Sequence, residues 1–216
     1  YMVEHYQRVV ETAARYGIMI NAHEPIKDTG LRRTYPNFLT REGARGQEYN
    51  AWGDGGGNPA DHVTVLPFTR LLAGPMDYTP GILDLTFDKY RPGNHVNHTL
   101  AKELALYVVI YSPLQMAADL IENYEGNPAF RFILDVPVDC EETRILHGQI
   151  GDVITTVRQE RDEEEWFLGS ITDENPRTLE AKLDFLTPGM IYGAEIYADG
   201  AGADWKTNPY PLEISR

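Results

Sequence analysis

The sequence predicts a mixed fold, with an α/β part followed by an all-β part. In the first part, a helix-like segment at residues 1–16 ends at Gly17 and leads directly into the short apolar run Ile18–Ala22. Helix, glycine and buried strand in this order are typical of α/β proteins. Toward the end of the chain, apolar and polar residues alternate with period two between Pro and Gly turns, which predicts antiparallel strands. We place the boundary between residues 136 and 137, where the pattern changes.

The first part, residues 1–136, is predicted to contain a few short strands among helices. The helix at residues 1–16 is amphipathic, because its apolar residues recur at helical spacing. We expect strands at Ile18–Ala22, Asn37–Arg41 and Leu71–Met76, and helices near Asp61–Arg70, 97–111 and 113–122. The Gly-rich stretch 43–59 is longer than an ordinary loop, which favours a functional segment. A complete eight-stranded α/β barrel usually needs about 250 residues, so this part can hold only about half of one.

The second part, residues 137–216, is predicted to form a small antiparallel β-sandwich. Strand candidates are Val153–Val157 and Trp166–Ile171, and the alternating segments 179–185 and 192–198 supply two more. The acidic run Asp162–Glu165 is interpreted as a solvated hairpin turn.

Composition and charge exclude several classes of protein. The chain has 216 residues, 42% of them hydrophobic, and its 19 Lys and Arg against 33 Asp and Glu give a net charge of −14. This acidic balance argues against nucleic-acid binding, which needs a basic face. No apolar run reaches the ~18 residues that predict a membrane span. The single cysteine, Cys140, excludes an internal disulfide and a cysteine-rich zinc site.

Three glutamates stand where an α/β barrel builds its active site. Glu24 follows the expected strand Ile18–Ala22, Glu42 ends the next one, and Glu48 lies in the loop beyond it. Active sites of such barrels lie at the carboxyl ends of the strands. Two carboxylates across a glycosidic bond are the minimum equipment for glycoside hydrolysis. Three oxygen donors close together can also hold Ca²⁺.

The same residues allow a structural interpretation. Most glutamates are solvated surface charges, and His23 at a strand end can bind a sugar hydroxyl or simply be hydrogen-bonded in place. Asp77, after the third expected strand, carries the same ambiguity. Several nearby cations could neutralise the three glutamates as ion pairs, namely Lys27, Arg32, Arg33, Arg41 and Arg45.

Several motifs resemble glycoside hydrolase family 97. They are Ile20–Pro25 (INAHEP), Arg33–Asn37 (RTYPN) and Thr40–Asn50 (TREGARGQEYN), followed in order by Gly74–Gly81 and Trp166–Asp173. The family contains α-glucosidases and α-galactosidases. The resemblance implies the second half of a (β/α)8 TIM-type barrel at residues 1–136 and a C-terminal antiparallel β-sandwich at residues 137–216.

The resemblance also implies roles for individual residues. Glu48 matches the general acid, and Glu24 matches the general base of the inverting branch. Glu24, Glu42 and Glu48 match the carboxylates around a Ca²⁺ ion, and His23 matches a substrate contact. Retaining members lack a glutamate at the position of Glu24. The resemblance therefore favours a calcium-assisted, inverting α-glucosidase acting on maltooligosaccharides or starch-type glycans.

Further expectations concern the context of the chain. The resemblance implies the C-terminal portion of a longer enzyme, inactive alone because the N-terminal β-domain and first barrel strands are missing. It also implies an oligosaccharide partner and a periplasmic or secreted location. Two alternatives stay open. One is an α-galactosidase of the same family, and the other is a non-catalytic carbohydrate-binding fragment with Trp166 or Trp205 stacking on sugars.

Overall fold

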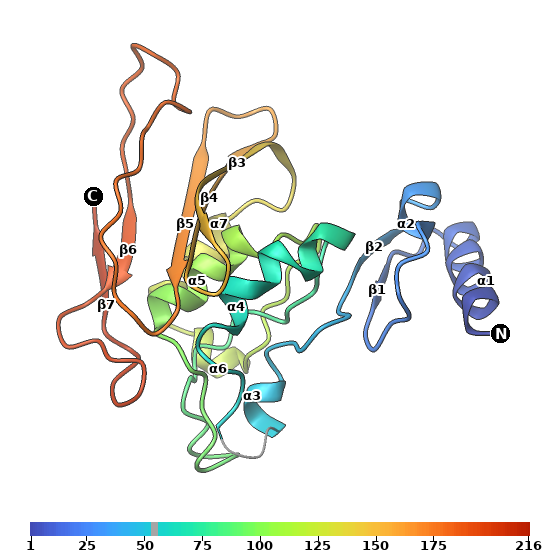
Figure 1. The fold of residues 1–216 in the computed structure, drawn as a ribbon, viewed down its shortest axis with the longest axis horizontal. Helices are drawn as coiled ribbons and strands as arrows, with labels where there is room; N and C mark the ends of the chain where they lie inside the picture. The colour runs from blue at the N-terminus through green and yellow to red at the C-terminus, as the bar shows by residue number, and fades with distance from the viewer. Residues whose placement is uncertain (53–55) are drawn as a thin grey trace.

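The computed structural model describes residues 1–52 and 56–216. Helix α1 (Met2–Arg15) and the strands β1 (Ile20–Ala22) and β2 (Phe38–Arg41) lie at the N-terminal side (Figure 1). The antiparallel strands lie at the opposite side, near the C-terminus. Part of the predicted Gly-rich stretch, residues 53–55, falls outside the described residues. In the part of the chain that the structure describes, no helix has the length and apolarity to cross a membrane.

Strands β1 and β2 form a short parallel edge, as the apolar runs predicted. Ile20 lies opposite Phe38 and Ala22 opposite Arg41, and Arg41 in turn forms a parallel bridge to Met76. The expected strand at Leu71–Met76 is wrong apart from this bridge, because Arg70–Ala73 forms a 3-10 turn. Within the described residues, the parallel part thus comprises two short strands and one bridge. The predicted half of a (β/α)8 barrel is not visible.

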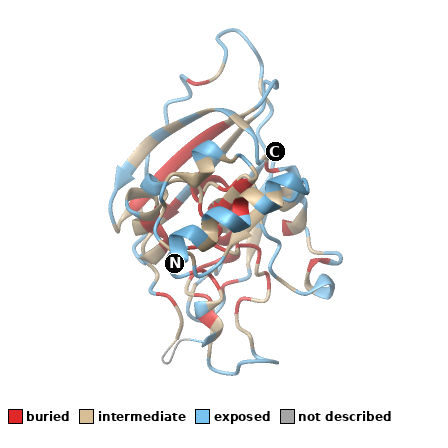
Figure 2. Cartoon of the chain, turned by 90° about the vertical axis from the view of Figure 1, so that its right-hand side faces the viewer, coloured by how far each residue is buried: buried red, intermediate tan, exposed pale blue. Residues whose placement is uncertain are grey.

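Helix α1 has the predicted length but little burial. Val10 is its one buried residue, whereas Met2, Val3 and Val9 expose their apolar side chains. Figure 2 shows this helix as a largely exposed element facing the viewer. The amide of Asn37 donates to the carbonyl oxygens of Val10 and Ile18, which ties α1 to the parallel edge.

Helix α5 (Leu100–Val109) forms the centre of the molecule and confirms the helix expected near 97–111. It begins at Thr99, whose hydroxyl accepts the N–H of Lys102 at 3.3 Å, an ordinary N-cap. Leu106 is buried on one side of the helix, and Leu104 and Val108 are buried on the other, so it is a core helix. The helix expected at 113–122 is wrong, since only α6 (Ile121–Tyr124) is helical there.

The remaining helices are short. They are α2 (Leu31–Thr34), α3 (Tyr49–Trp52), α4 (His62–Val65), the 3-10 turn Leu66–Phe68 and α7 (Ala129–Asp135). The helical segment expected near Asp61–Arg70 is therefore broken into α4 and two 3-10 turns. The sequence patterns missed α7.

The C-terminal part contains two antiparallel sheets, consistent with the expected β-sandwich. One has the order β3 (Cys140–Gln149), β4 (Val153–Glu160) and β5 (Trp166–Thr172), and the other pairs β6 (Ile196–Asp199) with β7 (Leu212–Ser215). Helix α5 packs closely on β5, where a Cβ on Gly169 would lie 2.7 Å from the Cβ of Val108. Gly169 is thus required for this approach.

One predicted strand of the C-terminal part is wrong. The alternating segment 179–185 forms no strand, and its Leu179 and Leu183 are exposed. Period-two alternation marks a strand only where a neighbouring strand pairs with it. Strands β3 and β7 were not predicted, because their exposed and half-buried residues give a weak apolar pattern.

Candidate functional site

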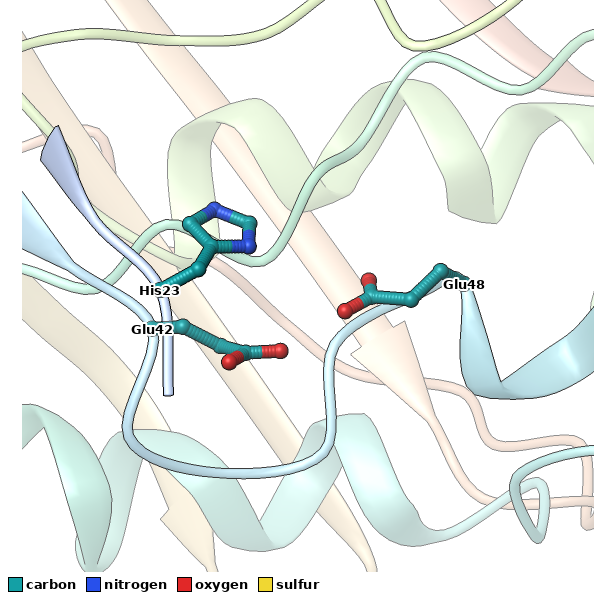
Figure 3. Close-up of side chains that lie close together, drawn as sticks. All are labelled: His23, Glu42 and Glu48. Atoms are coloured by element: carbon teal, nitrogen blue, oxygen red, sulfur yellow. The ribbon is translucent and has the colours of Figure 1, made fainter. Parts of the chain in front are cut away.

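Three side chains converge at the carboxyl end of the parallel edge. His23 follows β1, Glu42 follows β2, and Glu48 stands just before α3. One ligand atom from each residue lies within 4.8 Å of the others. Figure 3 shows the two carboxylates pointing toward one another, with the imidazole beside them. Two groups predicted from sequence, Glu42 and Glu48, are therefore brought together with the predicted substrate contact, His23.

Backbone pairing explains why residues so far apart in the sequence meet here. The N–H of Glu42 donates to the carbonyl oxygen of Ala22 at 2.9 Å, which continues the parallel ladder to the end of β2. The guanidinium of Arg70 donates to the carbonyl oxygens of Arg41 and Glu42 at 2.9 and 2.8 Å. Burial of this guanidinium lowers the pKa of Arg70 to about 10. The end of β2 is thus fixed on both sides.

The carboxylates of Glu42 and Glu48 lie close together. Glu42 is 6% exposed. Its burial and the hydrogen-bonding contact with the Glu48 side chain raise the pKa of Glu42. Gly46 makes room for this contact, because a Cβ there would lie 2.5 Å from Oε2 of Glu48 and 3.2 Å from Oε1 of Glu42. Two adjacent carboxylates repel each other unless a proton or cation lies between them.

Asp77 is the buried anchor of the site. It is 1% exposed and follows the bridging residue Met76. Its Oδ2 accepts hydrogen bonds from Asn21 Nδ2 at 2.5 Å and from His23 Nε2 at 2.7 Å. Burial opposes protonation of His23, but the hydrogen bond and charge of Asp77 outweigh burial and raise its pKa. Asp77 therefore fixes the orientation of the imidazole and favours its charged form.

The residue before Glu48 is held by a second buried carboxylate. Gln47 donates through Nε2 to Oε2 of Glu103, at 2.8 Å. The same Oε2 contacts His98 Nε2 at 2.5 Å, and Oε1 accepts the N–H of Gly81 at 2.6 Å. Glu103 is fully buried in α5. Burial lowers the pKa of His98 despite its acidic partner.

Glu24 follows His23 directly in the sequence and lies beside the cluster. Its side chain is not part of the cluster of His23, Glu42 and Glu48. It reaches the cluster through its backbone N–H, which donates to Oε2 of Glu42 at 3.0 Å. Its φ of 49° places it in the left-handed region, which is uncommon for a non-glycine residue. The roles of Glu24 as general base and metal ligand remain predictions.

The ion-pair alternative finds no support at these glutamates. Arg32 and Arg41 both pair with Asp28, at 3.1 and 3.5 Å. Within residues 1–52 and 56–216, no Lys or Arg forms an ion pair with any of the three predicted glutamates. The site therefore has excess negative charge.

A calcium ion would find suitable donors in part of the predicted set. Ca²⁺ takes oxygen ligands, and the adjacent carboxylates of Glu42 and Glu48 present such oxygens toward a common point. His23 is the poorer ligand for this ion, because it offers nitrogen instead of oxygen. The residues that fit this ion best are thus Glu42 and Glu48.

The sequence patterns gave little weight to the residues that support the site. Glu103 had a detectable signal, since it is a charged residue on the apolar face of the predicted helix 97–111. Asp77 followed an expected strand, which marked it as a candidate. Gln47 carried no signal, because its importance depends on its contact with the distant Glu103.

Comparisons with known proteins match both ends of the chain to one family. A family model described as "Glycoside hydrolase 97" matches residues 1–44. A second model, described as "Glycosyl-hydrolase 97 C-terminal, oligomerisation", matches residues 139–216.

Solved structures and curated relatives agree with the family models. A family 97 enzyme from Pseudoalteromonas sp. strain K8 in complex with acarbose is 56% identical, with a TM-score of 0.93 over 99% of this chain and 33% of that chain. A Glu-to-Gln variant from the same strain in complex with panose is 55% identical, with the same TM-score and coverage. A "Retaining alpha-galactosidase" from Bacteroides thetaiotaomicron is 34% identical over 95% of this chain and 32% of its own length. The chain thus spans about a third of the length of these relatives.

Proposed function

This chain belongs to glycoside hydrolase family 97, and we propose that the protein containing it hydrolyses α-glucosidic bonds of maltooligosaccharides with inversion. The observation that carries the proposal is the convergence of Glu42, Glu48 and His23 at the end of a parallel strand pair. Such a cluster of carboxylates at a carboxyl edge suits glycoside hydrolysis.

The proposed substrate is supported by a relative rather than by this chain. Panose is a trisaccharide of α-linked glucose, and it is bound by the family 97 enzyme that is 55% identical to this chain. The α-galactosidase name belongs to a relative with 34% identity. The higher identity favours an α-glucoside over an α-galactoside.

In the proposed mechanism, Glu48 is the general acid and protonates the leaving glycosidic oxygen. Glu24 is the general base and activates a water molecule on the opposite face of the sugar ring. Inversion needs the two carboxyl groups ~6.5–9.5 Å apart so that the water fits between them. His23, oriented by Asp77, donates a hydrogen bond to a sugar hydroxyl.

Calcium, with Glu42 and Glu48 as proposed ligands together with Glu24, would supply positive charge that offsets the adjacent carboxylates. Exhaustive chelation is expected to abolish hydrolysis, and restored Ca²⁺ should recover it. Unchanged activity after chelation would exclude the ion from the proposal.

The experiment follows the first-formed product of α-glucoside hydrolysis by NMR, using the full-length protein in which this chain occurs. Inversion predicts β-glucose as the first product. First-formed α-glucose would reject inversion, and faster cleavage of α-galactosides would favour the retaining α-galactosidase instead. Absence of activity on either glycoside would reject the enzyme proposal.

The role of Glu48 is tested separately with Glu48→Gln. General acid catalysis typically contributes about 10²–10⁴-fold, so maltose hydrolysis should fall by that order. A 4-nitrophenyl α-glucoside, whose leaving group needs little protonation, should be affected much less. Glu163→Gln is the matched control, because Glu163 is exposed in the acidic run. Full activity of Glu48→Gln on maltose would make the assignment wrong.

A further inference from the structure

Thr79 has an unusual backbone conformation beside the proposed acid. Its φ is 57°, in the left-handed region. A β-branched residue is a genuine outlier there, because its side chain crowds the backbone. Outliers of this kind persist only where the surrounding structure imposes them, and they cluster at functional sites. The strained backbone of Thr79 therefore indicates a functional contact of this residue.

The surrounding contacts hold Thr79 on both sides. Its N–H donates to Oδ1 of the buried Asp77 at 2.9 Å. The preceding Tyr78 is 2% exposed and belongs to the main core cluster. Two residues further on, the N–H of Gly81 donates to Oε1 of the fully buried Glu103. The chain cannot relax around Thr79 without breaking one of these buried contacts.

The result of this conformation is a hydroxyl aimed at Glu48. Oγ1 of Thr79 lies 2.8 Å from Oε2 of Glu48 and 2.6 Å from the carbonyl oxygen of Tyr78. A hydroxyl has one hydrogen to donate and two lone pairs to accept with. When the hydrogen points to Glu48, Thr79 holds a carboxylate. When it points to Tyr78, Oγ1 can accept the O–H of a carboxylic acid.

We propose that Thr79 is a positioning residue for Glu48, whose side chain the Thr79 hydroxyl holds in place through the 2.8 Å contact with Oε2. The proposal rests on the proposed function of Glu48 as general acid.

Asp77 gives this arrangement a wider consequence. The same carboxylate accepts the Thr79 N–H through Oδ1 and the His23 imidazole through Oδ2. The proposed acid and the proposed sugar contact are therefore oriented by one buried group. Strain at Thr79 is retained because a relaxed backbone would turn the hydroxyl away from Glu48.

The test compares Thr79→Val, Thr79→Ser and Thr79→Gly in the full-length protein. Valine keeps the β-branched shape and removes the hydroxyl, whereas serine keeps the hydroxyl. Thr79→Val should lower kcat/KM on maltose by about 10–100-fold, a part of what general acid catalysis supplies. On 4-nitrophenyl α-glucoside the loss should stay within a few-fold. Thr79→Ser should restore most of the maltose activity.

Thr79→Gly separates positioning from folding. Glycine adopts φ near 57° without strain, so this variant should keep its melting temperature while losing maltose activity as Thr79→Val does. If Thr79→Val does not fold, the pair of serine and glycine variants carries the same comparison. Thr69→Val is the matched control, since the Thr69 hydroxyl is exposed and donates to the carbonyl oxygen of Val65.

Specific outcomes would overturn the proposal. Equal losses on maltose and on the activated glucoside would show a merely structural role, as would a serine variant as impaired as the valine variant. If Glu48→Gln loses maltose activity and Thr79→Val does not, this inference fails while the proposed function stands. If Glu48→Gln keeps full activity, the proposed role of Glu48 fails first.

Discussion

Replacing Glu103 by glutamine probes the network that holds the loop of Glu48. The carboxylate of Glu103 accepts hydrogen bonds from Gln47 Nε2, from the Gly81 N–H and from His98 Nε2. Glutamine has nearly the same shape but one acceptor oxygen fewer. If its oxygen keeps Gln47 and His98, its amide nitrogen must face the N–H of Gly81. Two donors then meet at a fully buried position.

The expected loss of stability follows from these contacts. A hydrogen bond to a charged group contributes about 1.5–3 kcal/mol, and an unsatisfied buried donor costs about 1–3 kcal/mol. Removal of a buried charge offsets part of this loss, so we expect a decrease of about 3 kcal/mol in the free energy of unfolding. For a chain of this length, that corresponds to a melting temperature lower by about 6–12 °C.

The assay is urea and thermal unfolding of the chain, followed by circular dichroism. Glu122→Gln on α6 is the control, because Glu122 is exposed and its replacement should change stability by less than about 0.5 kcal/mol. A Glu103→Gln variant as stable as this control would refute the view that Glu103 is a structural acceptor. It would show that the Gln47 and Gly81 contacts contribute little.

Three further predictions concern titrating groups. Burial and Glu48 raise the pKa of Glu42, so ionisation of Glu42 destabilises the metal-free fold as pH rises through that pKa. In the presence of chelator at pH 7, the Glu42→Gln variant should therefore have a higher melting temperature than wild type. A lower melting temperature would contradict this. Lys102 donates to the carbonyl oxygens of Ala60 and Thr172, and burial lowers its pKa to about 8, so the unfolded chain binds more protons above pH 8. Between about pH 8 and 10, wild type should gain stability relative to Lys102→Met by up to about 1.4 kcal/mol per pH unit in urea unfolding; equal slopes would be the contrary result. Asp77→Asn should lower the pKa of His23, since Asp77 raises it, and an unchanged imidazole titration by NMR would show that Asp77 does not charge His23.

The fold could be predicted where local pattern decides the structure. The apolar runs around Ile20–Ala22 and Phe38–Arg41 became strands, and the apolar face of 97–111 became α5. Segment 179–185 shows the limit of this reasoning, because its alternation is as regular as that of a strand but no neighbour pairs with it. At Leu71–Met76 the guanidinium of Arg70 donates to the carbonyl oxygens of Gly74 and Pro75. That side chain contact favours a turn over a strand.

The location of the candidate site could be predicted from the sequence better than the residues that form it. Glu42 and Glu48 were marked by their place after a strand, and the structure brings them together. The structure placed His23 in the cluster in place of the Glu24 side chain. Both residues lie beyond the end of β1, and Glu24 has a left-handed backbone, so sequence position alone could not tell which of the two side chains turns inward.

The sequence by itself determined the alternation of helix and strand, the excess of negative charge and the motifs that identify the family. These are local or compositional properties, and they do not depend on contacts between residues that are distant in the sequence. The tertiary structure decided which groups meet. Asp77 reaches His23 and Asn21 across 54 and 56 positions, and Glu103 reaches Gln47 across 56. Contacts of that separation depend on the packing of the whole chain, which is why a strained threonine and a buried glutamate become visible only in three dimensions.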